Sequence, residues 1–188
     1  MMNQLLERPR AVPRAGTYAL HPDHCAVTLS VRHLVARTVR ARVAPLGGEL
    51  VLDDDPTSAK AWIDLDATSL TTGHPERDAV LHGPDLLDVD RFPFLRFESR
   101  EVAPLGPGRW SVQGDLYLRD LVGAVELDVR VLPTPPGRIA CVATTSIRRS
   151  TFELQWDERV ERLGLVVGDT VRVQMGVEFG AVDGGWDR

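Results

Sequence analysis

The chain of 188 residues lacks the features that define several protein classes. Its two cysteines, Cys25 and Cys141, are too few for a disulfide framework or a metal quartet. Each stands in an apolar or alternating run, so we expect both to be small core residues. The formal net charge of -5 argues against a nucleic-acid-binding surface, because contacts to phosphates need a positive face. No run approaches the roughly 18 apolar residues that a membrane-spanning helix needs.

The first residues also lack the apolar core of a signal peptide. The opening "MMNQLLERPRAVPRAG" carries arginines and prolines where that core would lie, so we expect a cytoplasmic protein. Residues 1–15 have little to bury and are expected to form a flexible arm. We expect one folded domain at residues 16–180 and a C-terminal tail at 181–188, because no linker or repeat divides the chain.

Alternation of apolar and polar residues dominates the chain from residue 25 onward. A period of two predicts strands with one buried face and one wet face. In "CAVTLSVRH", for example, Val27, Leu29 and Val31 share a face with His33. The clearest strands are predicted at residues 25–33, 60–67, 110–120, 124–132 and 170–179, with weaker candidates at 17–20, 38–43, 47–53, 94–102 and 139–149.

Turn signals such as "PLGG" and "PTPPG" separate these strands at the spacing of an antiparallel sandwich or barrel. Helical candidates are few: residues 75–83, where Pro75 suits a first turn and Gly83 a stop, and a short turn at residues 157–164. Closing the sheet on itself removes unpaired edges and brings the apolar faces together. We therefore predict an all-β antiparallel barrel of about eight strands. Its interior is either packed with side chains or holds one ligand, and the scarcity of inward aromatic residues favours a cavity.

Several segments resemble one known family. "GTYALHPDHCAVTLSVRHL" is similar to the opening of YceI-like proteins, the polyisoprenoid-binding family with a lipocalin-like barrel. "TSLTTGHPERDAVLHGPDLLDVDRFPFLRFES" resembles the strongest signature of that family, which contains Ser-x-x-Thr, Arg-Asp-x-x-Leu and Asp-Phe-Phe-Asp-Val. "VQGDLYLRD", "SIRRSTFELQW" and "GLVVGDTVRVQMGVEF" resemble later parts of its pattern. The resemblance runs from about Gly16 to Phe179.

The chain departs from the family pattern at several positions. Cys25 stands where the family usually has serine, and Leu86 and Leu87 replace its paired phenylalanines. Ala41 replaces the usual glycine, and Glu153 stands at the glycine of an Asp-Phe-Gly motif. These departures concern the shape of the pocket rather than the fold.

The resemblance implies an apolar cavity that binds a long-chain isoprenoid, such as a polyprenyl lipid or an isoprenoid quinone, without covalent chemistry. The protein would act as a carrier, store or sensor, with no cofactor other than the bound lipid. Family members are often dimers, so a homodimer through the outward Trp62 or Tyr117 is left open. Strand parity and the signature segment predict these ligand-binding residues: Val27, Leu29, Val31, His33, Ile63, Leu65, Arg77, Leu81, Leu86, Leu87, Phe97, Leu116, Leu118, Ile147, Phe152 and Met175.

Other interpretations of the same residues remain open. One alternative is a barrel with a packed interior that serves as an interaction module, which requires only the fold. The small residues Ala61, Gly114, Ala143 and Gly176 bear on this alternative, because they leave room for a ligand only if they all face one space. Arg77 and Asp78 are adjacent on the predicted helix, so their side chains diverge and need different partners; Arg77 either supports the barrel rim or meets the polar end of a ligand.

Metal and catalytic sites have weaker support. His21, His24 and Cys25 lie close together in "HPDHC", but this trio lacks a second ligand cluster, so we expect no metal. Serines, His82 and Asp85 are available for hydrolysis, but no Gly-x-Ser-x-Gly elbow is present. The sequence therefore favours a binding protein over an enzyme.

Overall fold

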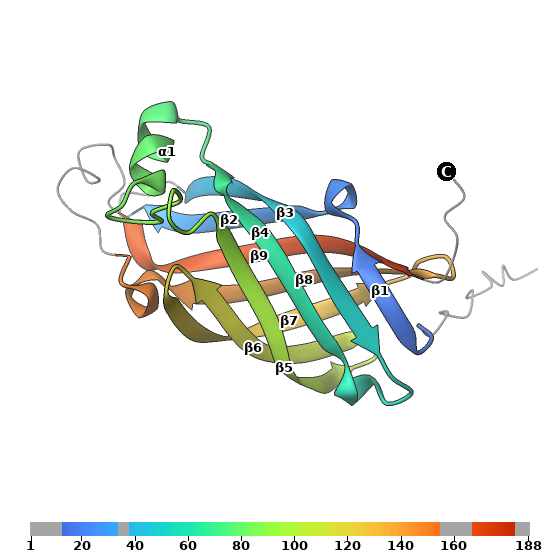
Figure 1. The fold of residues 1–188 in the computed structure, drawn as a ribbon. Helices are drawn as coiled ribbons and strands as arrows, with labels where there is room; N and C mark the ends of the chain where they lie inside the picture. Colours follow the sequence, from blue (N-terminus) through green and yellow to red (C-terminus); the bar gives the residue numbers. More distant parts are fainter. Residues whose placement is uncertain (1–12, 34–37, 155–166, 183–188) are drawn as a thin grey trace, which may run out of the picture.

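The computed structural model describes residues 13–33, 38–154 and 167–182. Nine strands form one antiparallel sheet that closes into a barrel (Figure 1). The strands are β1 (Gly16–Leu20), β2 (Ala26–His33), β3 (Thr38–Leu52), β4 (Lys60–Thr71), β5 (Phe94–Gly106), β6 (Arg109–Leu118), β7 (Leu121–Leu132), β8 (Arg138–Arg148) and β9 (Val167–Ala181). The short helices are α1 (Pro75–His82) and the 3-10 turns η1 (Pro22–His24), η2 (Pro56–Ser58) and η3 (Arg149–Phe152).

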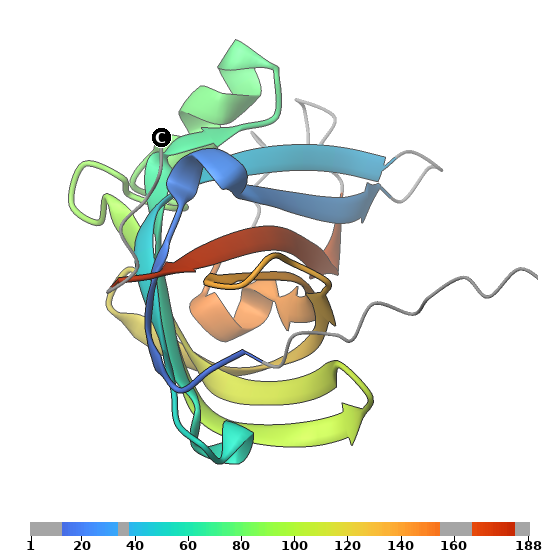
Figure 2. The same ribbon diagram turned by 90° about the vertical axis from the view of Figure 1, so that its right-hand side faces the viewer.

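The ring closes through the pairing of β3 with β4. From β4 to β9 each strand pairs with the next along the chain, and β9 is followed by β2 and then β3. β1 and β2 share one place between β3 and β9, because η1 interrupts what would otherwise be one long strand. The nine strands thus fill eight positions of a closed ring, which confirms the predicted barrel (Figure 2).

The predicted alternation places apolar side chains inside this ring. At the end that contains β1, which we call the packed end, buried apolar side chains form a core. Tyr18, Leu20, Ile139 and Phe179 are all buried there, and the hydroxyl of Tyr18 donates to the carbonyl oxygen of Arg14 at 2.8 Å. This end of the barrel has the packed core that one of the sequence interpretations assigned to the whole interior.

The predicted helix at residues 75–83 is present as α1, which begins at Pro75 and ends before Gly83. The predicted turn at 157–164, most of the N-terminal arm and most of the C-terminal tail lie outside the described residues. No helix in the described ranges is long and apolar enough to cross a membrane.

Candidate ligand-binding site

An apolar cavity of about 180 Å³ occupies the end of the barrel that carries α1 and η3. Its wall comes from the C-terminal halves of β2, β6 and β8, from the N-terminal halves of β3 and β5, and from parts of β4, β7 and β9 that reach the middle of each strand. The cavity is slightly larger than an engineered cavity of about 150 Å³ that stays dry and binds benzene. The space therefore suits an apolar group rather than ordered water.

Register explains why so many apolar side chains meet here. Residues directly opposite each other on paired strands share a face, so inward residues form rows around the wall. One row joins Ile63, Phe97 and Leu116 across β4, β5 and β6. Neighbouring rows are Leu65, Leu95 and Leu118, and, on the other side of the ring, Val39, Val31, Val171 and Ile147.

Most residues predicted to bind ligand line this cavity. They are Leu29, Val31, Ile63, Leu65, Leu81, Leu86, Leu87, Phe97, Leu116, Leu118, Ile147, Phe152 and Met175. The segment after α1 contributes Leu86 and Leu87, both buried, which stand where the family pattern has two phenylalanines. The structure thus brings together predicted residues from β2, β4, β5, β6, β8 and β9 and from the α1 segment, and ligand binding by them stays a prediction.

Three predicted residues are placed differently. Val27 is 2% exposed and is buried beside its register partners Val43 and Met175, but it is not among the lining residues. Arg77 is not among them either, since its Nε donates to the hydroxyl of Thr72 at 2.9 Å. His33 ends β2, and its side chain lies outside what the structure describes.

The small residues Ala61, Gly114, Ala143 and Gly176, which would leave room for a ligand only if they faced one space, do not line the cavity. Gly176 lies between Met175 and Val177, both buried inside the barrel, so strand alternation puts it on the outer face. At Gly114 the space is filled by the ring of Phe97, whose Cε2 lies 2.6 Å from the position of a Cβ. Of the lining residues on the strands, Ala41 and Ser30 are the smallest.

Polar residues of the signature segment fix α1 to the barrel. Thr71 Oγ1 donates to Asp78 at 2.6 Å, and the amide and hydroxyl of Thr72 donate to the same carboxylate at 2.8 and 2.5 Å. Although burial would raise the pKa of Asp78, these hydrogen bonds hold it below its usual value. Arg77 and Asp78 therefore share Thr72 as a partner, contrary to the expectation that their partners differ.

The same segment thus divides its residues between two tasks. The Nε2 of His82 donates to the carbonyl oxygen of Leu70 at 2.8 Å and adds a second tie between α1 and β4. Leu81, Leu86 and Leu87 face the cavity. Asp78, Arg77 and His82 hold the segment across the barrel end, and the leucines form part of the wall.

Sequence reasoning missed one charged residue of the lining, Arg149. Its Nε donates to the carbonyl oxygen of Gly168 at 3.1 Å and its Nη1 to that of Leu154 at 2.8 Å. Burial lowers the pKa of Arg149, and the charge of Asp169 acts in the opposite direction. The signal was available, because Arg149 continues the inward parity of Thr145 and Ile147 by two residues.

Ser69, Ser99 and His82, which were considered for catalysis, each form a hydrogen bond with the backbone. Ser69 Oγ donates to the carbonyl oxygen of Asp66 at 2.6 Å and accepts from the amide of Ala44 at 2.8 Å. Ser99 Oγ accepts from the amide of Ala61 at 2.8 Å. The Nε2 of His82 likewise donates to the carbonyl oxygen of Leu70, so each of these three side chains has a backbone partner.

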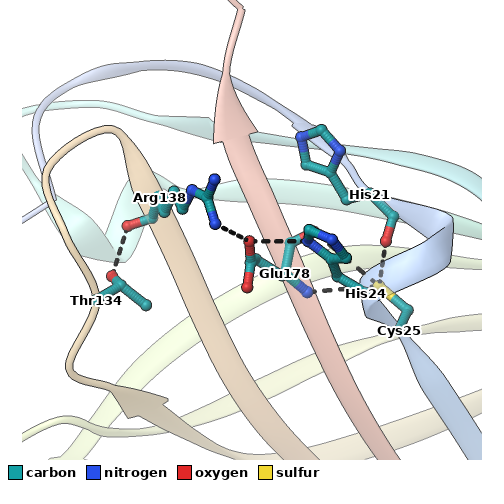
Figure 3. Close-up of polar contacts among 6 residues, drawn as sticks. All are labelled: His21, His24, Cys25, Thr134, Arg138 and Glu178. Atoms are coloured by element: carbon teal, nitrogen blue, oxygen red, sulfur yellow. Dashed lines mark hydrogen bonds and ion pairs between the residues drawn. The ribbon is translucent and has the colours of Figure 1, made fainter. Parts of the chain in front are cut away.

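The histidines considered for a metal lie at the packed end (Figure 3). Glu178 Oε1 contacts Nδ1 of His24 at 3.1 Å and Nη1 of Arg138 at 3.2 Å, while Cys25 Sγ donates to the carbonyl oxygen of His21 at 3.0 Å. Among the described residues no group of three or more His, Cys, Asp or Glu is placed to hold a metal ion. Both cysteines are free, and burial raises the pKa of Cys141 to about 12.

A closed antiparallel barrel with eight strand positions and an apolar cavity at one end has an architecture that can hold one small ligand. The chain belongs to the YceI-like family, because the model of the YceI-like domain matches residues 18–179. This match confirms the resemblance carried by the signature segment.

Individual relatives extend the match. A UPF0312 protein of Vibrio parahaemolyticus is 25% identical over 137 residues, which cover 70% of this chain and 72% of the relative. A UPF0312 protein of Yersinia pestis is 31% identical over 110 residues, 58% of this chain and 57% of the relative.

Solved structures share the architecture. BcnA of Burkholderia cenocepacia superposes with a TM-score of 0.73 at 18% identity, over 85% of this chain and 98% of BcnA. A domain from Saccharophagus degradans described as polyisoprenoid-binding gives a TM-score of 0.70 at 16% identity, over 87% of this chain and 98% of that domain. At these identities the likeness shows the fold alone.

Proposed function

We propose that the protein binds the apolar chain of an isoprenoid lipid, such as a polyprenyl lipid or an isoprenoid quinone, as a carrier, store or sensor. The observation that carries this proposal is the cavity of about 180 Å³ lined almost throughout by Leu, Val, Ile, Phe and Met. The description of the Saccharophagus degradans domain as polyisoprenoid-binding supports the same class of ligand.

The volume sets how much of the chain is enclosed. Because a cavity of about 150 Å³ admits benzene, this one holds one five-carbon prenyl unit and little more. At about 0.8 kcal/mol per buried CH₂ group, one such unit contributes roughly 4 kcal/mol before ordering costs. The end of the chain is buried in the barrel, and the rest runs out at the α1 end.

The binding is non-catalytic in this proposal, because Ser69, Ser99 and His82 are committed to backbone partners. The packed-interior alternative fits the β1 end but leaves the cavity at the α1 end without a role. The cytoplasmic location stays a prediction.

The direct test is extraction of the purified protein with organic solvent, followed by mass spectrometry. A stoichiometric prenyl lipid or quinone would support the proposal and name the ligand. Titration of the extracted protein with prenol, geraniol and farnesol then asks whether affinity rises with the first prenyl units. An empty extract together with no binding of any of these alcohols would refute the proposal.

A homodimer also stays a proposal. Trp62 and Tyr117 both lie on the outer face of the barrel, near Arg96, whose guanidinium lies 4.9 Å from the ring centre of Trp62. Sedimentation of the wild type and of a Trp62→Ala variant would test it, and a monomeric wild type would refute it.

A further inference from the structure

Arg119 makes contacts that its position in the sequence does not suggest. It lies in the two-residue turn between β6 and β7, where Leu118 pairs with Leu121, and its φ of 57° is in the left-handed region. A turn arginine is normally solvated, but this side chain is half-buried. Its Nη1 donates to the carbonyl oxygen of Leu86 at 3.0 Å, and its Nη2 donates to that of Phe152 at 3.1 Å.

Both acceptors belong to the end of the barrel that holds the cavity. Leu86 lies in the α1–β5 loop (residues 83–93), and Phe152 ends η3. The two residues are 2% and 1% exposed, and both line the cavity. Figure 2, viewed along the barrel, shows η3 within the outline of the ring. One guanidinium thus joins two segments that lie 33 residues away from it on either side.

The β6–β7 hairpin holds η3 at a second point. The ring of Phe152 packs against Gly123, so closely that a Cβ there would lie 2.5 Å from Cζ. The carbonyl of Phe152 is held by Arg119 and its ring by the start of β7, so η3 is fixed to this hairpin. The α1–β5 loop is joined to the same hairpin through Arg119.

The chemistry suits a clasp. The guanidinium presents several N–H groups in a rigid plane, so it can serve two carbonyl oxygens in different directions, which a lysine ammonium does with less fixed geometry. Hydrogen bonds from a charged donor are among the stronger ones in proteins. Without Arg119 both carbonyls of these buried residues would lose a charged donor.

We propose that Arg119 is a positioning residue that clasps the α1–β5 loop to η3 and thereby controls how fast a ligand enters and leaves the cavity. This inference rests on the proposed function, since it assigns a role at the same cavity. Arg119 touches backbone oxygens of the wall and is not a lining residue. Loss of the clasp therefore lowers the energy barrier to both entry and exit of the ligand, and it changes the affinity less.

The test uses N-phenyl-1-naphthylamine, an apolar fluorescent probe, and stopped-flow measurement of its association and its displacement by farnesol. Arg119→Met keeps an unbranched apolar stem but removes the hydrogen-bond donors. In this variant we expect both rate constants to rise about tenfold and Kd to stay within about threefold of the wild-type value. Tenfold corresponds to about 1.4 kcal/mol of barrier. Arg119→Lys, which keeps the charge without the fork, should give intermediate rates.

Arg96→Met is the matched control. Arg96 also makes two charged hydrogen bonds, to Asp64 at 2.6 and 2.7 Å, but on the outer face. It should lower stability while leaving both rate constants unchanged. Rate constants of folded Arg119→Met that equal those of the wild type, or the same acceleration in Arg96→Met, would overturn the clasp.

Hydrogen exchange separates the clasp from the binding proposal. The amides of Leu87 and Val89 donate to carbonyl oxygens of Leu81 and His82, so they report on the α1–β5 loop without any ligand. Their exchange should be about tenfold faster in Arg119→Met, or in Arg119→Lys if the first variant does not fold. If exchange is faster in the variant but the wild type does not bind the probe, the proposed function is refuted and the clasp is not. If exchange is unchanged in the variant, the clasp is overturned.

Discussion

The replacement of Ala41 by phenylalanine offers a sharp test of the cavity. Ala41 lies on β3 opposite Leu29, and its methyl group lines the cavity. The new side chain adds a phenyl ring, and a cavity of about 180 Å³ exceeds the roughly 150 Å³ that admits benzene. The ring should therefore enter the cavity and occupy the place of the first prenyl unit.

The magnitudes favour a large change in binding and a small one in stability. Burial of a phenylalanine side chain contributes about 1.5–3 kcal/mol, and strain from overpacking costs about 1–3 kcal/mol, so the two nearly cancel. Exclusion of one prenyl unit removes up to about 4 kcal/mol of binding free energy, which corresponds to roughly a hundredfold to thousandfold weaker affinity.

Calorimetric titration with farnesol measures the affinity, and urea unfolding measures the stability. Arg40→Phe is the control, because Arg40 precedes Ala41 on the same strand and is exposed. It should bind farnesol like the wild type. If Ala41→Phe is folded and binds farnesol within threefold of the wild type, the ligand does not occupy this cavity.

Three further substitutions test the structure around the site. Asp78→Asn should lower the free energy of unfolding by about 1–3 kcal/mol at pH 7, because it removes a charged acceptor. Since hydrogen bonding holds the pKa of Asp78 below its unfolded value of about 3.9, its contribution is complete above that pH and is lost as the pH falls through the lowered folded pKa. Urea unfolding at pH 7 and near pH 3 should therefore give a smaller difference at the lower pH, and equal differences would contradict this account. Glu153→Gly should stabilise the protein by roughly 0.5–1 kcal/mol in thermal unfolding, since Glu153 has a φ of 52° and a non-glycine residue pays about 1–2 kcal/mol there, partly offset by the entropy of glycine. Gly123→Ala should cost about 1–3 kcal/mol, because the new methyl group displaces the ring of Phe152; an unchanged melting temperature would show that the ring can move freely.

The sequence predicted the barrel and 13 of the 27 residues that line the cavity, largely because the wall depends on strand alternation. Leu29, Ile63 and Leu116 lie far apart in the chain, yet a period of two puts each on the inner face, and register brings them to one level. The same rule also gives the inward position of Arg149, which continues the parity of Thr145 and Ile147 one residue beyond the end of β8. The rule puts Gly176 on the outer face, because its neighbours Met175 and Val177 point inward.

Contacts made by long or hydroxyl side chains could not be predicted in this way. The backbone pattern of "LYLRDLVG" indicates a hairpin turn, but nothing in it shows that Arg119 folds back toward Leu86 and Phe152. Likewise, the shared use of Thr72 by Arg77 and Asp78 depends on how α1 is tilted against β4. Such contacts follow from the spatial arrangement of distant segments, which local patterns do not encode.

The departures from the family pattern fall into two groups with different physical consequences. Glu153 keeps the left-handed backbone for which the family pattern has glycine, so the turn after η3 is retained at a cost in stability. Leu86, Leu87 and Ala41 all line the cavity. Because leucine is smaller than phenylalanine, Leu86 and Leu87 widen the cavity near α1. Because alanine is larger than glycine, Ala41 narrows the cavity at β3. The scaffold is therefore held constant while the wall is reshaped, and the reshaped wall is where the selectivity of this chain for its ligand should lie.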